Sequence, residues 1–483
     1  MSPVRGASAS GAPASAPSST ARPARPSEVG TRRELTVGRI AHGGFCVARD
    51  EGRVVFVRHA LPGERVLARI TDDSHDRYWR ADAVEILEAS PDRVPAPCPH
   101  AGPGACGGCD WQHATPAAQR RGKAEVVIES LRRFGGVDVG PLVVEAVAPD
   151  PSGAEPSGVE PSGGLDGVDG LDWRTRMRFA VTADGQVGLR ASRSHEVLAT
   201  PDCRIAHPLV RAALADRRFP AAAVVEVAVS PASDAVAVEV HTGGAPGGGT
   251  RVGTAHAGAV RGSAAGRGGG GGTASGAPDA PDAPIGAGRI VEVVGQRSFA
   301  VGSGVFWQVH AAAPKVLVDA VRTALRPQPG ETALDLYAGA GLFAAFLAED
   351  VGPSGRVVAM ESEAAAVAAA ADNLADLPQV SLRAVRVTPA TVRGVLGTGP
   401  SAGRVGCAVL DPPRAGAGAE VVAALLGHHP RAVAYVACDP VALGRDLATF
   451  RARGYTMTAL RAFDLFPMTH HVECVALFEP TVR

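Results

Sequence analysis

The sequence predicts an α/β protein whose C-terminal part is a doubly wound sheet and whose N-terminal part is a small β-domain. Two observations support this prediction. Between residues 311 and 483, strand-like runs alternate with helical patterns, and several of the strands end in polar residues. Between residues 30 and 92, short strand-like runs are separated by glycine-containing turns, a spacing typical of a small OB-like barrel.

Composition supports several domains joined by segments without a core. The chain has 483 residues, of which 46% are hydrophobic, but it also contains 59 glycines and 38 prolines. The 48 Lys and Arg residues nearly balance 49 Asp and Glu, so the chain is not a uniformly basic nucleic-acid binder. A local RNA site remains compatible with this charge. Because we find no membrane helix and no signal peptide, we expect a cytoplasmic protein without a membrane partner. We also expect the protein to be a monomer.

Three segments rich in small residues are expected to be disordered, because they lack a hydrophobic period. Residues 1–29 form a tail, and residues of about 147–170 and 243–288 form insertions. Both insertions interrupt a central region, which we place at residues 93–310.

The small β-domain is expected to contain five strands. Glycine turns at Gly43-Gly44, Glu51-Gly52 and Pro62-Gly63 separate most of them. A generic β-module is the alternative to a barrel. The expected strands cover residues 34–40, 45–49, 54–57, 65–72 and 81–87.

The C-terminal domain is expected to have strands at residues 332–336, 356–360, 407–410 and 432–437. The first strand leads into Gly339-Ala340-Gly341, a turn that lets a cofactor approach the backbone, and then into a helix near Leu342. Glu361 ends the second strand, where an acidic side chain can hold ribose hydroxyls. These features predict a nucleoside-bearing cofactor, although nicotinamide and flavin domains use related turns.

Two further strand ends carry groups suited to methyl transfer. The prolines in Asp411-Pro412-Pro413-Arg414 hold an extended backbone, so Asp411 can project into the cleft, which favours S-adenosylmethionine over a dinucleotide. Cys438 ends the next strand just before a helix that begins near Val441. We expect the helix dipole to favour the thiolate of Cys438, as in a nucleophile. The alternatives are an ordinary proline-rich strand exit and an inert buried cysteine.

Four of the eight cysteines are expected to bind metal. Cys98, Cys106 and Cys109 lie close together in a Gly- and Pro-rich loop, and Cys203 is the next cysteine along the chain. Four thiolates suit either tetrahedral zinc or an iron–sulfur cube, and spacing alone does not distinguish the two. His100 or His113 could replace one thiolate, although each is more often a surface histidine.

Taken together, these motifs resemble the RNA 5-methyluridine methyltransferase family, bacterial enzymes that methylate uracil C5 in ribosomal or transfer RNA. The β-domain resembles a TRAM domain, an RNA-binding OB-type barrel, through Val37-Gly38, Gly43-Gly44 and Leu61-Pro62-Gly63-Glu64. The other matching motifs include Phe306-Trp307-Gln308, Asp335-Leu336-Tyr337 with the glycine turn, Asp411-Pro412-Pro413-Arg414, Tyr435-Val436-Ala437-Cys438 and the segment from Phe466 to Glu473.

The resemblance implies a Rossmann-like class I methyltransferase domain, the TRAM barrel and a central iron–sulfur and RNA-binding region. It makes Cys438 the nucleophile that adds to uracil C6 and Glu473 the general base. The chain departs from the family in having Asp439, where Asn is usual. The resemblance also implies S-adenosylmethionine contacts from Gln308, Tyr337, Glu361 and Asp411, and a 4Fe-4S cluster on Cys98, Cys106, Cys109 and Cys203.

The expected partner is RNA, with ribosomal RNA favoured over transfer RNA. One alternative is a noncatalytic RNA-binding protein that retains the fold, and this alternative predicts loss of Cys438 or Glu473. Both residues are present. Another alternative is a flavin- or nicotinamide-dependent oxidoreductase that uses the iron–sulfur centre.

Overall fold

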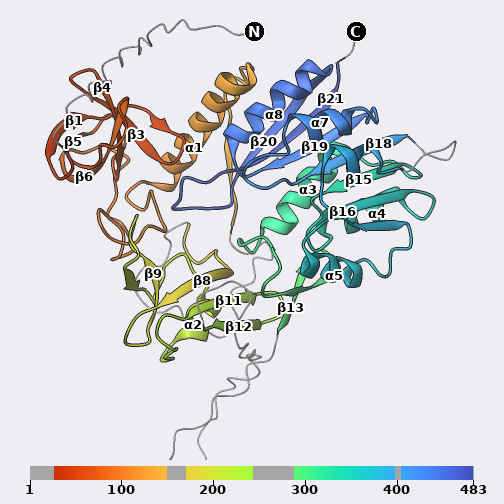
Figure 1. Cartoon of the computed structure of the whole chain (residues 1–483), viewed down its shortest axis with the longest axis horizontal. Helices are drawn as coiled ribbons and strands as arrows, with labels where there is room; N and C mark the ends of the chain where they lie inside the picture. The colour runs from red at the N-terminus through yellow and green to blue at the C-terminus, as the bar shows by residue number, and fades with distance from the viewer. Residues whose placement is uncertain (1–26, 149–169, 243–287, 397–403, 482–483) are drawn as a thin grey trace, which may run out of the picture.

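The structure, a computed structural model, describes residues 27–148, 170–242, 288–396 and 404–481. The tail and both insertions expected from the sequence therefore lie almost entirely outside the described residues. Within the tail's expected bounds, residues 27–29 are described, and the Glu28 N–H donates to Asp73 Oδ2 at 2.6 Å. The β-domain, the central sheet and the large C-terminal sheet are seen as three parts in Figure 1.

The β-domain is one six-stranded sheet in the order β1-β5-β6-β4-β3-β2. The Gly38 N–H donates to the Val47 carbonyl at 2.8 Å, so the segment after β1 lies against β3 and the sheet curls around its core. The first expected strand is wrong in one respect: it is split, because this pairing takes residues 37–39 out of β1. The strands are β1 (Arg32–Thr36), β2 (Ile40–Ala41), β3 (Phe45–Asp50), β4 (Arg53–Arg58), β5 (Arg65–Asp72) and β6 (Tyr78–Glu88).

The central region contains a five-stranded antiparallel sheet in the order β10-β9-β8-β11-β12 and a separate hairpin, β13–β14. Trp173, Phe179 and Ile205 belong to its hydrophobic core. Its elements are β8 (Arg176–Val181), β9 (Val187–Arg190), β10 (Val197–Ala199), α2 (Pro208–Leu214), β11 (Val224–Ser230), β12 (Ala235–His241), β13 (Arg289–Val294) and β14 (Arg297–Gly302).

Two elements that we assigned to the central region pack instead with the C-terminal sheet. Helix α1 (Pro116–Ser130) continues into the π-helical turn η1 (Leu131–Gly135), and the following strand β7 (Val144–Ala146) pairs with the far edge of that sheet. Val127 and Leu131 are fully buried there. Ala124, Val127 and Leu131 enter a hydrophobic core of this sheet, a long-range contact that the local sequence pattern does not specify.

The C-terminal domain is an eight-stranded sheet in the order β17-β16-β15-β18-β19-β21-β20-β7. The first five strands in this order, from β17 to β19, are parallel to one another. Strand β21 is antiparallel to both of its neighbours, β19 and β20. The four expected strands are confirmed, whereas β17, β20 and β21 were not foreseen. The strands are β15 (Thr332–Leu336), β16 (Arg356–Glu361), β17 (Val380–Ala384), β18 (Val405–Leu410), β19 (Ala432–Ala437), β20 (Tyr455–Asp464) and β21 (Glu473–Pro480).

Helices cover both faces of this sheet, as a doubly wound fold requires. Helices α3, α4 and α5 share one hydrophobic core with it, and α1, α6, α7 and α8 share the other. Side chains alternate accordingly along β15, where Ala333 enters the first core and Leu334 the second. The remaining helices are α3 (Ala313–Leu325), α4 (Leu342–Val351), α5 (Ala364–Asn373), α6 (Pro389–Arg393), α7 (Ala419–Leu426) and α8 (Pro440–Ala452).

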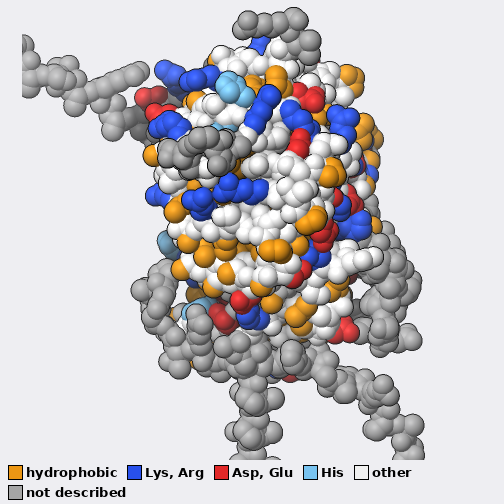
Figure 2. All heavy atoms as spheres, turned by 90° about the vertical axis from the view of Figure 1, so that its right-hand side faces the viewer, with side chains coloured by type: hydrophobic (Ala, Val, Ile, Leu, Met, Phe, Trp, Pro, Cys, Tyr) orange, Lys and Arg blue, Asp and Glu red, His pale blue; other side chains and the backbone are white. Residues whose placement is uncertain are grey.

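The surface of the C-terminal domain carries both signs of charge. Figure 2 shows the side of the molecule that lies on the right in Figure 1, where basic, acidic and apolar side chains are interspersed. This mixture agrees with a net charge of −1. Among the described helices, none has both the length and the apolar character that a membrane crossing requires.

Candidate active site

The candidate site lies at the edge of the large sheet where its parallel strands end. Strands β16 and β18 lie on opposite sides of β15, so the order of the strands reverses at β15, where a crevice forms at the carboxyl ends. Tyr337 follows β15, Asp411 follows β18 and Cys438 follows β19. Because β21 is antiparallel, its first residue, Glu473, lies at the same edge. The fold thus brings together residues that are far apart in the sequence.

Cys438 and Glu473 lie opposite each other at this edge. The last pair of the β19–β21 ladder is Ala437 with Cys474, so one step further places Cys438 across from Glu473. Glu473 is almost fully buried, with 3% of its surface exposed. Burial, followed by repulsion from Asp411, raises the pKa of Glu473 well above its usual value, although Arg414 opposes this shift. Glu473 is therefore a carboxyl group poised to hold a proton.

The thiol of Cys438 does not behave as we expected. Burial, with added repulsion from Glu473 and Asp411, raises its pKa to about 12, so the expected thiolate is wrong for the free site. The N-terminus of α8 does not compensate, because the Asp439 carboxylate already accepts the N–H groups of Val441 and Ala442, each at 2.9 Å. The thiol of Cys438 is therefore protonated at neutral pH in the free site.

The glycine turn after β15 adopts the backbone geometry that the sequence suggests. Gly341 has φ +91°, and a Cβ there would lie 2.9 Å from Leu374, so glycine is required by both conformation and space. The Gly339 N–H donates to Glu361 Oε2 at 2.9 Å, which ties the turn to the end of β16. Tyr337 has φ +71°, an unusual conformation for a residue with a side chain and one found at functional sites.

Two carboxyl groups next to this turn have no cationic partner among the residues that the structure describes. Asp335 is fully buried; its Oδ2 accepts the Ala344 N–H at 2.8 Å, but Oδ1 has no hydrogen-bond partner among the described residues. Burial raises the pKa of Asp335 to about 8 and that of Asp411 to about 7. Buried carboxyl groups of this kind suit a positively charged ligand. The donor set therefore fits S-adenosylmethionine, whose sulfonium and ammonium groups are cationic.

Gln308 lies in the loop between β14 and α3 and is half-buried. Its neighbour Trp307 is buried, whereas Phe306 is 69% exposed. Within the described part of the chain, the Gln308 amide makes no hydrogen bond. Of the four expected cofactor residues, Tyr337, Glu361 and Asp411 lie at the strand ends around the crevice.

A pocket beside Cys438 contains residues that sequence reasoning did not select. His42, Arg414 and His471 line it together with Cys438. His42 comes from the β2–β3 turn of the β-domain, and its Nε2 lies 3.0 Å from Asp439 Oδ2. Nothing local in the sequence connects positions 42 and 439, whereas His471 sits inside the C-terminal motif and could have been found there. Burial lowers the pKa of His471 to about 3, so its imidazole is neutral.

Helix α1 makes hydrogen bonds to the loop that carries His471 and to the end of the strand before it. Lys123 is fully buried and donates to Asp464 Oδ1 at 2.5 Å and to the Phe466 carbonyl at 3.0 Å. The Gln119 side chain accepts the Met468 N–H at 2.8 Å. These bonds fix the path of the chain between β20 and β21. Helix α1, which we assigned to the central domain, therefore positions the loop that leads to Glu473 at the edge of the large sheet.

A second loop contact fixes the same segment from the β-domain side. The Asp110 carboxylate accepts hydrogen bonds from His470 of the β20–β21 loop at 2.6 Å and from Arg58 of β4 at 3.0 Å. A Cβ on Gly44 would lie 2.9 Å from His470, so the β2–β3 turn packs closely on this loop. The β-domain therefore forms one wall of the pocket around Cys438.

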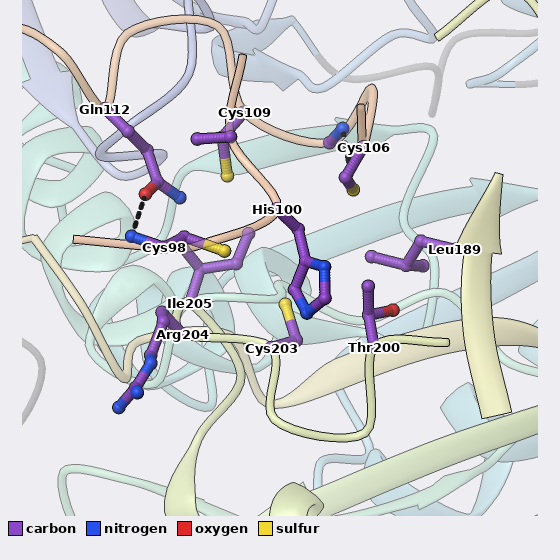
Figure 3. A pocket seen from close by; sticks show the side chains of 12 residues that line it. Cys98, His100, Cys106, Cys109, Gln112, Leu189, Thr200, Cys203, Arg204 and Ile205 are labelled. Carbon is purple, nitrogen blue, oxygen red and sulfur yellow. Dashed lines mark hydrogen bonds between the residues drawn. The ribbon is translucent and has the colours of Figure 1, made fainter. Parts of the chain in front are cut away.

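The four selected cysteines converge on a second pocket, in the central region. Cys98, Cys106, Cys109 and Cys203 line it, and their sulfurs face a common space beside His100 in Figure 3. The Cys98 N–H donates to the Gln112 side chain at 3.0 Å, and Gly108 donates to Cys106 Sγ at 3.4 Å. Burial, with repulsion from Cys106 and Cys98, raises the pKa of Cys203 to about 11.

The sulfurs are more widely spaced than a single zinc ion requires. Among the described residues, three ligand atoms lie within 4.8 Å of one another at Glu226, Glu239 and His241. No three of the four cysteine sulfurs lie that close together. Zinc–sulfur bonds of about 2.3 Å in a tetrahedron bring sulfurs to within about 3.8 Å of each other. His100 lines the pocket near Asp202, whereas His113 is buried elsewhere beside His59, so His113 is not a ligand candidate.

Comparisons with known proteins agree with this geometry. A family model described as TRAM domain matches residues 26–84, and one described as tRNA (Uracil-5-)-methyltransferase matches residues 401–481. An RNA methyltransferase of Streptomyces avermitilis is 45% identical over 94% of this chain and all of that protein. A 23S rRNA (uracil(1939)-C(5))-methyltransferase RlmD of Halomonas elongata is 34% identical over 93% of this chain and 89% of that protein.

A solved structure shares the fold. The Pyrococcus abyssi tRNA (uracil-54, C5)-methyltransferase in complex with S-adenosyl-L-homocysteine superposes with a TM-score of 0.60 at 19% identity, covering 92% of this chain and 99% of that one. The fold and the site at the carboxyl ends of the strands thus define an S-adenosylmethionine-dependent methyltransferase with a class I fold. The chain belongs to the family of RNA (uracil-5-)-methyltransferases.

Proposed function

We propose that this enzyme methylates C5 of a uridine in RNA, with ribosomal RNA as the preferred substrate, through a covalent bond between Cys438 and uracil C6. The single observation that carries the proposal is the pairing of a thiol and a buried carboxyl group, Cys438 and Glu473, at the strand edge next to the cofactor crevice. Uracil C5 is a weak nucleophile, so methylation requires prior activation of the ring.

In the first step, the Cys438 thiolate forms a bond to C6. The electrons of the C5=C6 double bond move toward C5 and the C4 oxygen, which makes C5 nucleophilic. When bound, S-adenosylmethionine supplies a methyl group on a positively charged sulfur. A cation in this crevice also lowers the pKa of the surrounding acids, including Cys438, whose free-site pKa is about 12.

In the last step, the C5 proton must leave. The Glu473 carboxylate, which must have lost its own proton before this step, takes the C5 proton. The electrons of the C5–H bond re-form the C5=C6 double bond, and the bond between C6 and sulfur breaks with its electrons returning to sulfur. The carboxyl group suits this role because burial favours its protonated form at the end of the step. Its position across from Cys438 places base and nucleophile against the same ring.

Gln308, Tyr337, Glu361 and Asp411 are the residues we assign to the cofactor. Asp411 and the buried Asp335 offer negative charge when ionised, and the Gly339–Glu361 hydrogen bond shapes the turn beside them. Two prolines after Asp411 keep its backbone extended at the sheet edge. These groups bind and orient the donor, whereas Cys438 and Glu473 act on the base.

For the cysteines, a 4Fe-4S cluster is the proposal that their spacing favours. A cube of iron and sulfide is larger than one ion and needs more widely separated thiolates. Four neighbouring thiolates also repel one another, so they require a strongly cationic centre. The methylation needs no redox step. We therefore assign the cluster a structural role, joining the loop before α1 to the central sheet.

The preference for ribosomal RNA is supported by relatives whose similarity extends over nearly the whole chain. The Halomonas elongata enzyme and a Shewanella protein that is 28% identical over 95% of this chain are both named 23S rRNA (uracil(1939)-C(5))-methyltransferases. Transfer RNA is named in the family model, which matches only residues 401–481, and in the solved structure, which is 19% identical to this chain. The target uridine is expected to flip out of a loop to reach Cys438.

Nucleoside mass spectrometry of ribosomal and transfer RNA from a strain lacking the gene, beside its parent, tests the proposal. We expect 5-methyluridine to disappear from ribosomal RNA and to return when the wild-type gene is restored. A gene for the Cys438→Ala variant provides the matched control and should not restore it. Loss confined to transfer RNA would contradict the substrate preference, and restoration by Cys438→Ala would contradict the mechanism.

A further inference from the structure

Three side chains of metal-ligating types meet on one face of the central sheet. Glu226 of β11 lies directly across from Glu239 of β12, and His241 ends β12 two residues further along the same face. One ligand atom from each of the three lies within 4.8 Å of the others. None of the three lines the Cys438 pocket or the four-cysteine pocket, so the proposed function leaves this cluster without a role.

His241 directs one ring nitrogen at both carboxyl groups. Its Nε2 atom is buried and makes no hydrogen bond to any residue that the structure describes. It lies 3.7 Å from Glu226 Oε2 and 3.7 Å from Glu239 Oε2, which is too long for a hydrogen bond. In a tetrahedral zinc site with bonds of about 2.1 Å, the ligand atoms are about 3.4 Å apart. The spacing is therefore close to that of ligands around one ion.

Neighbouring groups orient both carboxylates toward this nitrogen. The Ser303 hydroxyl donates to Glu239 Oε1, and the Arg178 guanidinium lies 3.4 Å from Glu226 Oε1. Each carboxylate therefore presents its second oxygen, Oε2, to His241. Outer contacts of this kind fix the orientation of metal ligands.

The charges of the cluster favour a cation. Two carboxylates directly opposite each other in an antiparallel pair repel. Glu239 is only 8% exposed, and the Ser303 hydroxyl that holds it is neutral. Arg178 lies beside Glu226 and is 62% exposed, so solvent weakens its effect. A cation between the two Oε2 atoms would compensate both carboxylates at once.

We propose that Glu226, Glu239 and His241 bind one divalent transition-metal ion such as Zn²⁺. Imidazole nitrogen suits such ions, whereas Mg²⁺ and Ca²⁺ prefer oxygen ligands. The ion fastens the end of β12 to β11, and because Ser303 follows β14, the site also links the central sheet to the β13–β14 hairpin. This site is independent of the four cysteines and of the methylation reaction.

Zinc binding to the anaerobically purified full-length enzyme tests the site. The protein is dialysed to equilibrium against a zinc buffer that contains a large excess of Mg²⁺, and bound zinc is counted by inductively coupled plasma mass spectrometry. We expect the wild type to hold about one zinc ion per chain that Glu239→Gln and His241→Gln both lose. Zinc should also raise the unfolding midpoint temperature of the wild type more than that of either variant.

Matched variants separate metal binding from folding and from the cysteines. His195→Gln makes the same change at an exposed histidine between β9 and β10 and should keep the ion. Ser303→Ala keeps all three ligands but loses the bond that orients Glu239, so it should weaken zinc binding by about tenfold. Cys203→Ser alters the four-cysteine pocket and should also keep the ion.

Equal zinc content in the wild type and in folded His241→Gln would overturn the site. So would an ion that Cys203→Ser loses while both ligand variants retain it, because that ion would lie in the four-cysteine pocket. Absence of bound zinc from the wild type would overturn it as well, and would leave a protonated His241 imidazole as the group that compensates the two carboxylates.

Discussion

Cys438 and Glu473 lie directly across from each other, one step beyond the last pair of the β19–β21 ladder. After burial, repulsion from Glu473 is the largest electrostatic cause of the raised pKa of Cys438. The two groups are therefore coupled before any substrate binds. In the proposed reaction they act in turn on one ring, the thiol at C6 and the carboxylate at C5.

Glu473→Gln separates the two chemical steps. The amide cannot accept the C5 proton, so turnover should fall by about 10²- to 10⁴-fold, while the methylated RNA remains bonded to Cys438. A denaturing gel with ordinary uridine RNA and S-adenosylmethionine should show a slowly migrating protein–RNA species. Loss of both turnover and this species would mean that Glu473 acts before the adduct forms.

Binding of the cofactor should depend on pH through Asp411. Burial raises the pKa of Asp411 to about 7, so its carboxyl group is protonated below this pH, and a cationic ligand binds best once it ionises. Affinity for S-adenosylmethionine, measured by calorimetry, should therefore increase as the pH rises from 6 to 8. Asp411→Asn should bind more weakly and lose most of this dependence. An unchanged slope in the variant would assign the titration to another group.

The same raised pKa has the opposite consequence for the stability of the free enzyme. A carboxyl group whose folded pKa lies above its unfolded value binds more protons when folded, so its stabilising contribution is complete below pH 4 and is lost as the pH rises through about 7. Relative to wild type, Asp411→Asn should gain more in unfolding midpoint temperature at pH 8 than at pH 5. A constant difference at both values would contradict the assigned pKa.

The Lys123–Asp464 pair should be essential for stability. Both groups are buried, and removing one leaves an uncompensated charge, so Lys123→Met should cost about 3–5 kcal/mol in the free energy of unfolding. The exposed pair Lys315–Asp319 on α3 provides the control, since Lys315→Met should cost less than about 0.5 kcal/mol. Urea unfolding measures both. Similar small losses would show that water reaches the Lys123 site.

The four-cysteine pocket should bind iron. Cys203→Ser should lose most of the bound iron and acid-labile sulfide found in anaerobically purified wild-type protein, because three thiolates hold a cluster poorly. Cys407→Ala changes a buried cysteine in the sheet core and should keep the metal. Zinc in place of iron in protein from iron-replete, anaerobic cells would contradict the cluster.

Much of the site could be predicted from the sequence because its residues follow strands with clear local signals. Asp411 and Cys438 each end a buried apolar run, and Gly341 marks a turn that only glycine can adopt. The fold then places such strand ends together, as any doubly wound sheet does. Cys98, Cys106 and Cys109 were selected because they cluster in one Gly- and Pro-rich loop, and Cys203 because it is the next cysteine along the chain.

What the sequence did not reveal depends on long-range packing or on electrostatics. His42 reaches Asp439 across 397 positions, and Lys123 of α1 supports the loop between β20 and β21 by donating to Asp464. The state of Cys438 was mispredicted because the capping carboxylate of Asp439 occupies the helix N-terminus and because burial outweighs the dipole. Burial has no local signature, whereas the N-cap Asp439, which stands directly before Pro440, does.

The central claim, a bond between Cys438 and uracil C6, is tested most directly with RNA that contains 5-fluorouridine. Fluorine at C5 cannot leave as a proton does, so the methylated adduct should persist. Intact mass spectrometry should show wild-type enzyme increased by the mass of the RNA plus one methyl group, and peptide mapping should place the bond at Cys438. Cys438→Ala should show no such species, and an adduct formed by this variant, or one mapped to another residue, would contradict the account.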